Sequence, residues 1–170
     1  MTLPSLAEIE QLAAARGLLL RLQVRRWLAI TSLRVVVARP RSELPPLLLG
    51  ELKGWSLPLP DGLQLDTMRV QGSHTQAVGA LIWAATFAWA LEATPCRSAR
   101  LLAIRDHEAQ HRRLVRYFRR LGFEPIRDVG AAAADLPLRL VWGGAGLLMR
   151  GDCAVGLERA WRAVQWVDPA

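Results

Sequence analysis

The sequence has few of the residues that cross-link a chain or carry it across a membrane. Cys96 and Cys153 are its only cysteines and form no CxxC pair, so we expect reduced thiols and no disulfide framework. The longest apolar run, 77–91, contains Thr86 as its only polar residue and is shorter than the ~20 residues that span a bilayer. The first ten residues contain two glutamates and no basic segment ahead of an apolar stretch, so no export signal is expected. These features predict a cytoplasmic protein without a membrane span, in which 77–91 is a buried core helix.

Lysine is almost absent as well. Lys53 is the only one, and arginine supplies nearly all the positive charge behind a formal net charge of +7 and a pI near 11.1. A basic balance favours anionic partners, such as a phosphorylated cofactor, an acidic protein or a nucleic acid. Skewed base composition in the gene also replaces lysine by arginine, so the charge alone assigns no partner.

The length and composition are those of a single domain covering 1–170, because 170 residues with 52% hydrophobic content can bury one sizeable core. Ser5 and Glu8 have the spacing of a capping box, which predicts a helix over 5–15 that ends at Gly17. Strands are expected at 18–24, 28–37, 47–56 and 63–70. We expect a turn at 25–26 and, because of its prolines, an exposed connection at 39–46.

The second half of the chain alternates helices and strands. A polar loop at 71–76 precedes the apolar helix 77–93, and an amphipathic helix is expected at 107–121, ending at Gly122. Asp152 is expected to cap a final helix that runs to about residue 166. The intervening strands are predicted at 99–104, 123–129 and 138–149, with 143–146 as a bulge or a close backbone approach. The pattern is that of an α/β protein.

The segment Leu114-Val-Arg-Tyr-Phe-Arg-Arg-Leu-Gly-Phe123, together with this order of elements, resembles the core of the GNAT superfamily of acetyl-CoA-dependent N-acetyltransferases. A late helix of that family ends in Leu-Tyr-x-x-x-Gly-Phe. The resemblance covers about 47–149. It implies a mixed, mainly antiparallel central sheet flanked by helices, with 152–166 as an additional C-terminal helix. It also implies that acetyl-CoA or another acyl-CoA is the cofactor and that an amine is the acceptor.

The loop before the family's long helix follows the pattern Arg/Gln-x-x-Gly-x-Gly/Ala, and its backbone amides hold the cofactor's diphosphate at a helix N-terminus. The matching segment here is His74-Thr-Gln-Ala-Val-Gly79, in which His74 replaces the arginine and Ala77 replaces the first glycine. An ordinary helix-opening loop has the same composition. The resemblance assigns cofactor binding to this loop and to two residues of strand 63–70, namely His74, Thr75, Gln76, Ala77, Val78, Gly79 and Ala80 with Met68 and Val70.

The catalytic positions of the family are also altered. The tyrosine that protonates the departing thiolate corresponds to Phe118, and Tyr117 is turned about 100° from it around the helix. Asp66 and Glu51 are the candidate carboxylates for accepting the amine proton, although both are also ordinary solvated strand residues. Two interpretations stay open: an acyltransferase that uses Asp66, Glu51 and Tyr117, and a catalytically inactive scaffold that acts as an assembly or regulatory partner.

Two further patterns lie in the helix 107–121. His107-Glu-Ala-Gln-His111 matches H-E-x-x-H, the zinc-hydrolase motif. The arginines beside it disfavour a divalent cation, so we expect helix-surface histidines and no metal. The helix also carries an arginine face, which suits an acidic protein partner and consists of Arg112, Arg113, Arg116, Arg119 and Arg120. No nucleic-acid-binding motif accompanies it, so nucleic acid is not the expected partner.

Overall fold

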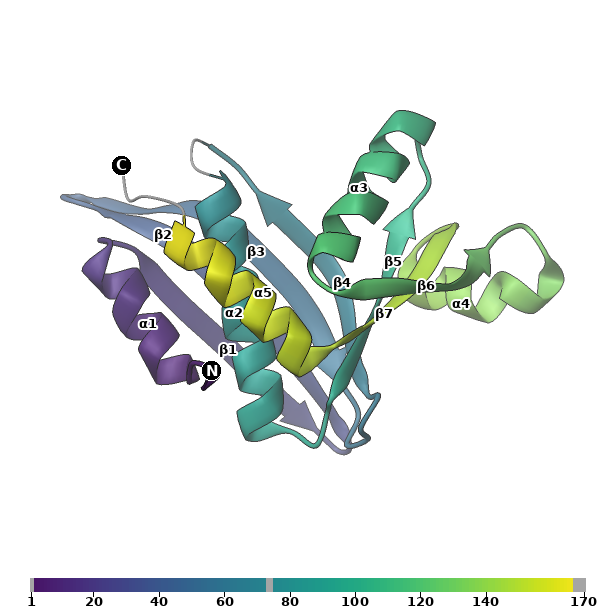
Figure 1. The fold of residues 1–170 in the computed structure, drawn as a ribbon, viewed down its shortest axis with the longest axis horizontal. Coiled ribbons are helices and arrows are strands. Elements are labelled where there is room, and N and C mark those ends of the chain that lie inside the picture. The colour runs from purple at the N-terminus through teal and green to yellow at the C-terminus, as the bar shows by residue number, and fades with distance from the viewer. Residues whose placement is uncertain (1, 73–74, 167–170) are drawn as a thin grey trace.

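The computed structural model describes residues 2–72 and 75–166, with a seven-stranded sheet of order β1-β2-β3-β4-β5-β7-β6 at the centre (Figure 1). All neighbouring strands pair antiparallel except β4 and β5, which are parallel. The expected α/β fold with a mainly antiparallel sheet is therefore confirmed at this level.

The first half of the chain is a helix followed by a four-stranded meander. In α1 (Leu6–Ala15) the predicted capping box is present, because the Ser5 amide donates to Glu8 Oε2 at 2.7 Å and the Glu8 amide donates to Ser5 Oγ at 3.2 Å. Consecutive antiparallel strands then follow: β1 (Leu19–Trp27), β2 (Ile30–Arg41), β3 (Leu44–Ser56) and β4 (Leu63–Val70).

Two predicted connections in this meander are wrong. β1 continues through 25–26, because Arg25 and Arg26 pair with Ser32 and Thr31, and the chain turns at Leu28-Ala29 instead. The segment 39–46 is exposed as expected, but it is not an irregular connection, because β2 and β3 pair as far as Arg41 and Leu44. Pro40 is accommodated at a register shift, where its missing amide hydrogen interrupts no ladder.

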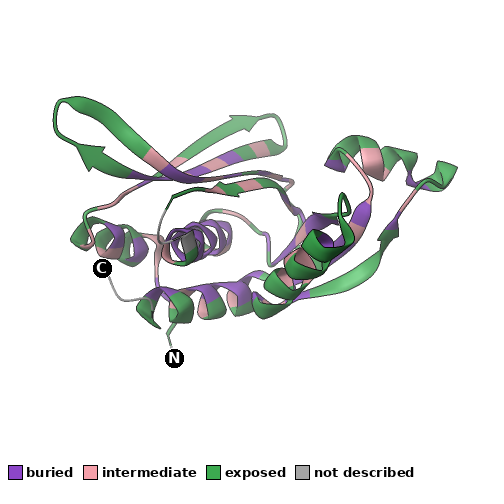
Figure 2. Ribbon diagram, turned by 90° about the horizontal axis from the view of Figure 1, so that it is seen from above, coloured by how far each residue is buried: buried purple, intermediate pink, exposed green. Residues whose placement is uncertain are grey.

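Helix α2 (Thr75–Ala93) is the centre of the core. Trp83 and Phe87 are among its fully buried side chains. The window Gln76–Ala93 is long and apolar enough, by length and composition alone, to cross a membrane, but 72% of it is buried inside the protein. α2 contacts β2 and β3 on one side and α1 and α5 on another, so these helices form a layer over one face of the sheet (Figure 2).

The second half of the chain contains β5 (Ser98–Ile104), α3 (Glu108–Arg120), β6 (Phe123–Val129), a short 3₁₀ turn (Ala133–Asp135), α4 (Leu136–Trp142), β7 (Gly146–Asp152) and α5 (Cys153–Trp166). Asp152 caps α5 as predicted, because its Oδ1 accepts from the Val155 amide at 2.9 Å. α5 is the expected C-terminal helix.

The strand predicted over 138–149 is wrong. Residues 136–142 form α4, which has Pro137 in its first turn and ends at Gly143 in the left-handed conformation (φ 76°). β7 begins only at Gly146. Gly146 is the close approach that the glycine-rich segment suggested, because a Cβ there would collide with the Ala103 carbonyl of β5.

Candidate functional site

The sheet divides where β4 and β5 meet. These strands pair at Leu63↔Ala99, Gln64↔Arg100 and Leu65↔Leu101, and the ladder goes no further. Asp66 is the extra residue of a β-bulge, because Leu65 pairs with Gly54 and Thr67 pairs with Lys53. Beyond it β4 stays with β3 while β5 stays with β7. The two parallel strands therefore separate towards their carboxyl ends.

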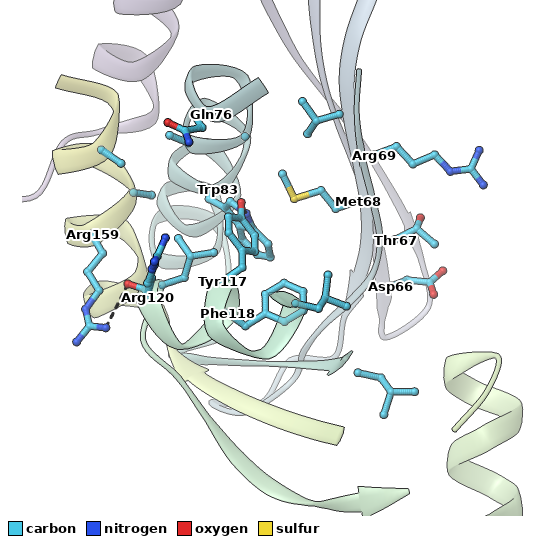
Figure 3. Close-up of a pocket in the computed structure, with 18 of the residues that line it drawn as sticks. Asp66, Thr67, Met68, Arg69, Gln76, Trp83, Tyr117, Phe118, Arg120 and Arg159 are labelled. Atoms are coloured by element: carbon cyan, nitrogen blue, oxygen red, sulfur yellow. Dashed lines mark hydrogen bonds between the residues drawn. The ribbon is translucent and has the colours of Figure 1, made fainter. Parts of the chain in front are cut away.

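A cleft of about 680 Å³ occupies the space between the separated strands. Met68 and Val70 of β4 line one side, Leu102 and Ile104 of β5 the other, and side chains of α2, α3 and α5 close the back (Figure 3). A smaller cavity of about 40 Å³ lies next to the point of separation, and Leu52, Leu65 and Leu101 are among its lining residues. The lining is largely apolar with a few polar groups, which is typical of small-molecule sites.

Tyr117 of α3 contributes a hydroxyl group to the lining of the cleft. Its Oη accepts a hydrogen bond from Trp83 Nε1 at 2.7 Å. A Cβ added at Gly79 would lie 3.4 Å from both Tyr117 Oη and Met68 Cε, so α2, α3 and β4 meet at this point. Because the indole is only a donor, the phenol keeps its own hydrogen for another acceptor.

The surroundings of Tyr117 keep that hydrogen in place at neutral pH. The residue is 39% exposed, and its hydroxyl group lies in a partly buried contact with Trp83. Burial raises the pKa of the phenol above its ordinary value of 10.0, and the hydrogen bond from Trp83 partly opposes that rise. Tyr117 is therefore a protonated group facing the cleft.

Tyr117 and Phe118 both line the cleft although they are adjacent on α3. Phe118 packs edge-on against Trp83 and Phe123, with ring centroids 6.2 Å and 6.1 Å apart. Adjacent residues differ in direction by about 100° around a helix. The cleft extends far enough around α3 for both side chains to line it. The position expected for the family's tyrosine thus belongs to an aromatic cluster, and its neighbour supplies the hydroxyl.

Neither candidate carboxylate is aimed into the cleft. Asp66, Thr67 and Arg69 line the cleft, but their side chains point away from it (Figure 3), and Asp66 is exposed. Glu51, which pairs with Arg69, is ion-paired with Arg34 and lies 3.6 Å from Lys53 Nζ. The hydrogen bond from Arg34 holds the pKa of Glu51 below its ordinary value. Asp66 is therefore exposed to solvent, and Glu51, whose side chain is 16% exposed, is held by Arg34.

The predicted cofactor loop is described in part. His74 lies outside the described residues, and Thr75 is described as the backbone start of α2. Gln76, Gly79 and Ala80 line the cleft, whereas Val78 packs towards Gly50 of β3. The first turn of a helix has amides without intrahelical partners and carries the positive end of the helix dipole. That end of α2 is at the rim of the cleft and suits an anion.

The H-E-x-x-H segment is not arranged as a metal site. His107 is the exposed N-cap residue of α3, whereas His111 is only 5% exposed, contrary to the expected surface position. His111 Nδ1 is 3.2 Å from the Ile104 carbonyl and Nε2 is 3.4 Å from Arg105 Nη2. Arginine only donates, so Nε2 accepts and both ring nitrogens are engaged. Across 2–72 and 75–166, no group of three or more metal-ligating side chains is clustered.

The arginine face of α3 is present and exposed, at Arg112, Arg113, Arg116, Arg119 and Arg120. Within the described ranges none of these five forms an ion pair. Arg159 of α5 donates through Nη1 to the Arg119 and Arg120 carbonyls at 3.0 and 3.2 Å (Figure 3). It thereby caps the C-terminus of α3 at the rim of the cleft.

Trp83 is a cleft residue that the sequence analysis did not assign. It follows Gln76 and Gly79 at helical spacing (i, i+3, i+7), and this shared face of α2 was the available signal. No protein-family model matches the chain, and a search of curated proteins finds no match either. The fold and the site define an α/β protein with an open cleft between two diverging parallel strands.

Proposed function

We propose that the chain is a GNAT-like acyltransferase that transfers an acetyl or other acyl group from acyl-CoA to an amine. The separation of β4 and β5 after three residue pairs carries this proposal, because it opens a cleft that leads to the N-terminal end of α2. The sequence resemblance and the cleft both support acyl-CoA as the ligand.

The cleft has the features that an acyl-CoA needs. Beyond Leu65, the side of β4 that faces β5 has no strand partner, so its peptide groups can pair with the amides of the extended thioester arm. In the proposal the diphosphate lies at the first turn of α2, where Gln76 is exposed and Ala77 is half-buried. The amides of Met68 and Val70 are the candidates for polarising the thioester carbonyl.

The proposed chemistry is direct attack. The amine nitrogen forms a bond to the thioester carbonyl carbon, and the carbon–sulfur bond then breaks. The departing thiolate takes the hydrogen of the Tyr117 hydroxyl, and the nitrogen loses its proton to water. Water takes this role in the proposal because Glu51 does not line the cleft and the Asp66 carboxylate points away from it. The phenolate regains its proton from solvent before the next turnover.

Thermal unfolding with acetyl-CoA tests the proposal. A ligand that binds the native state stabilises it by about 2.7 kcal/mol at 100 times its Kd, so the melting temperature must rise. Gly79→Leu is the matched control, because leucine keeps the helix and its side chain fills the space between Met68 and Tyr117. We expect a clear shift for the wild type and none for Gly79→Leu. No shift at millimolar acetyl-CoA rejects the acyltransferase proposal.

The second candidate function is a scaffold without catalysis that binds an acidic protein. The exposed arginine face of α3, without ion pairs among the described residues, favours it. Arg112, Arg113 and Arg116 also lie outside the cleft lining. Replacing all three by glutamine should therefore abolish binding of an acidic partner and leave acyl-CoA binding unchanged. A partner retained from native extract by the wild type and lost from this variant supports the scaffold, whereas a chain that elutes alone at every salt concentration rejects it.

A further inference from the structure

The β1–β2 turn exposes a run of apolar side chains at one end of the sheet. Trp27 is 73% exposed, Leu28 is 82% exposed, and Ala29 and Ile30 are exposed as well. Four consecutive exposed apolar residues are a liability in a folded protein unless they have a function. Hairpin turns are otherwise built from glycine, asparagine and aspartate.

The conformation of this turn is unfavourable for its sequence. Leu28 has a φ of 52°, in the left-handed region that a side chain with a Cβ rarely adopts. Trp27 pairs with Ile30, so the turn is tight and Leu28 stands at its apex. A glycine or asparagine would satisfy this geometry and would expose less apolar surface. Local strain and apolar exposure therefore coincide at one residue, which points to a role outside folding.

A second turn extends the same surface. Thr31 pairs with Ser56, which places the β1–β2 turn beside the β3–β4 turn at the lower end of the sheet in Figure 1. Leu59, in the second turn, is 50% exposed. We name Trp27, Leu28, Ile30 and Leu59 the apolar tip.

The charge around the apolar tip is positive. Arg25 and Arg26 directly precede Trp27, are exposed, and take part in no ion pair among the described residues. The acidic residue of the neighbouring turn, Asp61, is neutralised by Arg100 at 3.0 Å. The tip thus combines a tryptophan and aliphatic side chains with two uncompensated guanidinium groups.

We propose that the apolar tip is a docking element for an anionic lipid surface. Tryptophan and aliphatic side chains insert at the headgroup boundary, and guanidinium groups bind the headgroup phosphates. A turn is convex and can enter a soft interface without a matching groove. This inference is independent of the proposed acyl transfer.

The docked orientation leaves the cleft accessible. β4 and β5 run from the end of the sheet that carries the tip, at Leu63 and Ser98, to the end that carries the cleft, at Val70 and Ile104. The protein would therefore stand on the lipid surface with the cleft facing the aqueous phase.

Co-sedimentation of the full chain with vesicles tests this proposal. We expect binding to phosphatidylcholine vesicles that contain phosphatidylglycerol, and binding at least about tenfold weaker to phosphatidylcholine alone, because the charge contribution is absent there. The double variant Trp27→Ser, Leu28→Asn should bind the anionic vesicles about tenfold more weakly. Asparagine tolerates the positive φ of residue 28, so this variant is expected to keep the wild-type melting temperature.

Two further variants make the test specific. Leu140→Ser removes an apolar side chain that is 75% exposed on α4, away from the tip, and should leave vesicle binding unchanged. Arg25→Gln with Arg26→Gln should weaken binding to anionic vesicles and flatten its dependence on salt. Absence of vesicle binding by the wild type overturns the proposal, as does wild-type binding by the tip variant. A tip variant that instead dissociates an oligomer in gel filtration also overturns it and assigns the tip to contact with a second copy.

Discussion

Trp83 and Tyr117 are joined by a hydrogen bond of 2.7 Å, from the indole nitrogen to the phenol oxygen, inside the cleft between β4 and β5. The contact links α2 to α3 and fixes the phenol beside Gly79. It also orients the phenol hydrogen, because the oxygen already accepts from the indole and the O–H bond must point elsewhere. Two residues that are 34 positions apart in the chain thus together orient one proton donor.

Tyr117→Phe removes this proton donor and also the acceptor of the Trp83 indole hydrogen bond. If acyl transfer occurs as proposed, the turnover number should fall by about 100-fold or more, because the thiolate must then leave without general-acid assistance. The KM for acetyl-CoA should change little, and the melting-temperature shift with acetyl-CoA should persist. Trp83→Phe is the companion variant, since it removes the hydrogen bond and keeps the phenol. Full turnover by Tyr117→Phe would show that another group protonates the thiolate.

Two helical glycines should respond oppositely to alanine. At Gly156 of α5 a Cβ would lie 2.6 Å from Phe87 Cε2, and Phe87 is fully buried, so Gly156→Ala should lower the free energy of unfolding by about 1–3 kcal/mol. At Gly79 of α2 the nearest atoms are 3.4 Å away, and Gly79→Ala should raise that free energy by up to about 1 kcal/mol through helix propensity. Chemical denaturation of both variants measures the difference. Equal effects would contradict the close packing of α5 on α2.

Alkaline pH should destabilise the protein through Cys153. Burial, as the largest cause, raises the pKa of this thiol from 9.0 to about 12. The folded state therefore holds the proton after the unfolded state has lost it. The resulting stability is complete below pH 9 and is lost as pH rises towards 12, by an amount on the order of 4 kcal/mol.

Denaturation curves across that pH range, for the chain with and without Cys153→Ala, measure this contribution. The pKa of Tyr117 is also raised, so both proteins should carry Tyr117→Phe to remove a second contribution of the same sign. We expect a flatter decline with pH for Cys153→Ala. Parallel curves would place the alkaline sensitivity elsewhere.

Replacing the two histidines of the H-E-x-x-H segment should change the stability of the protein by different amounts. In a zinc site both histidines would be ligands, and both replacements would be costly. His111→Ala leaves the Ile104 carbonyl and Arg105 without their contacts and should cost about 1–3 kcal/mol of stability. His107→Ala, at an exposed N-cap without a side-chain hydrogen bond, should change stability by less than about 0.5 kcal/mol. A chelator should leave the melting temperature unchanged. Equal losses for both variants, with zinc in the purified protein, would restore the metal hypothesis.

Most helices and strands were accessible from the sequence because their signals are local. The capping box of Ser5 and Glu8, the cap of Asp152 and the glycine after α3 each act within one helix end. The β1–β2 turn was misplaced because the pairing of Arg25 and Arg26 with β2 decides it, not their polarity. The helix at 136–142 was mistaken for a strand because short apolar runs suit both structures.

No local sequence pattern predicts the cleft. Its geometry depends on the bulge at Asp66, and a bulge is a property of the register between β3 and β4, not of either strand alone. The same register turns the Asp66 side chain away from the cleft. The alternation of residues along β4 therefore does not predict on which face of the sheet this side chain lies. The placement of Tyr117 likewise depends on where α3 docks, which no local pattern encodes.

Only three residue pairs between β4 and β5 join the two parts of the sheet, β1–β4 and β5–β7–β6. Backbone hydrogen bonds set the angle between ordinary neighbouring strands, but along most of this boundary there are none to set it. Helix packing joins the two parts of the sheet there, because α2 contacts β2, β3, β4 and α5, and α5 contacts β7. We therefore expect the contact of the Phe87 ring with Gly156, where α2 meets α5, to influence the width of the cleft.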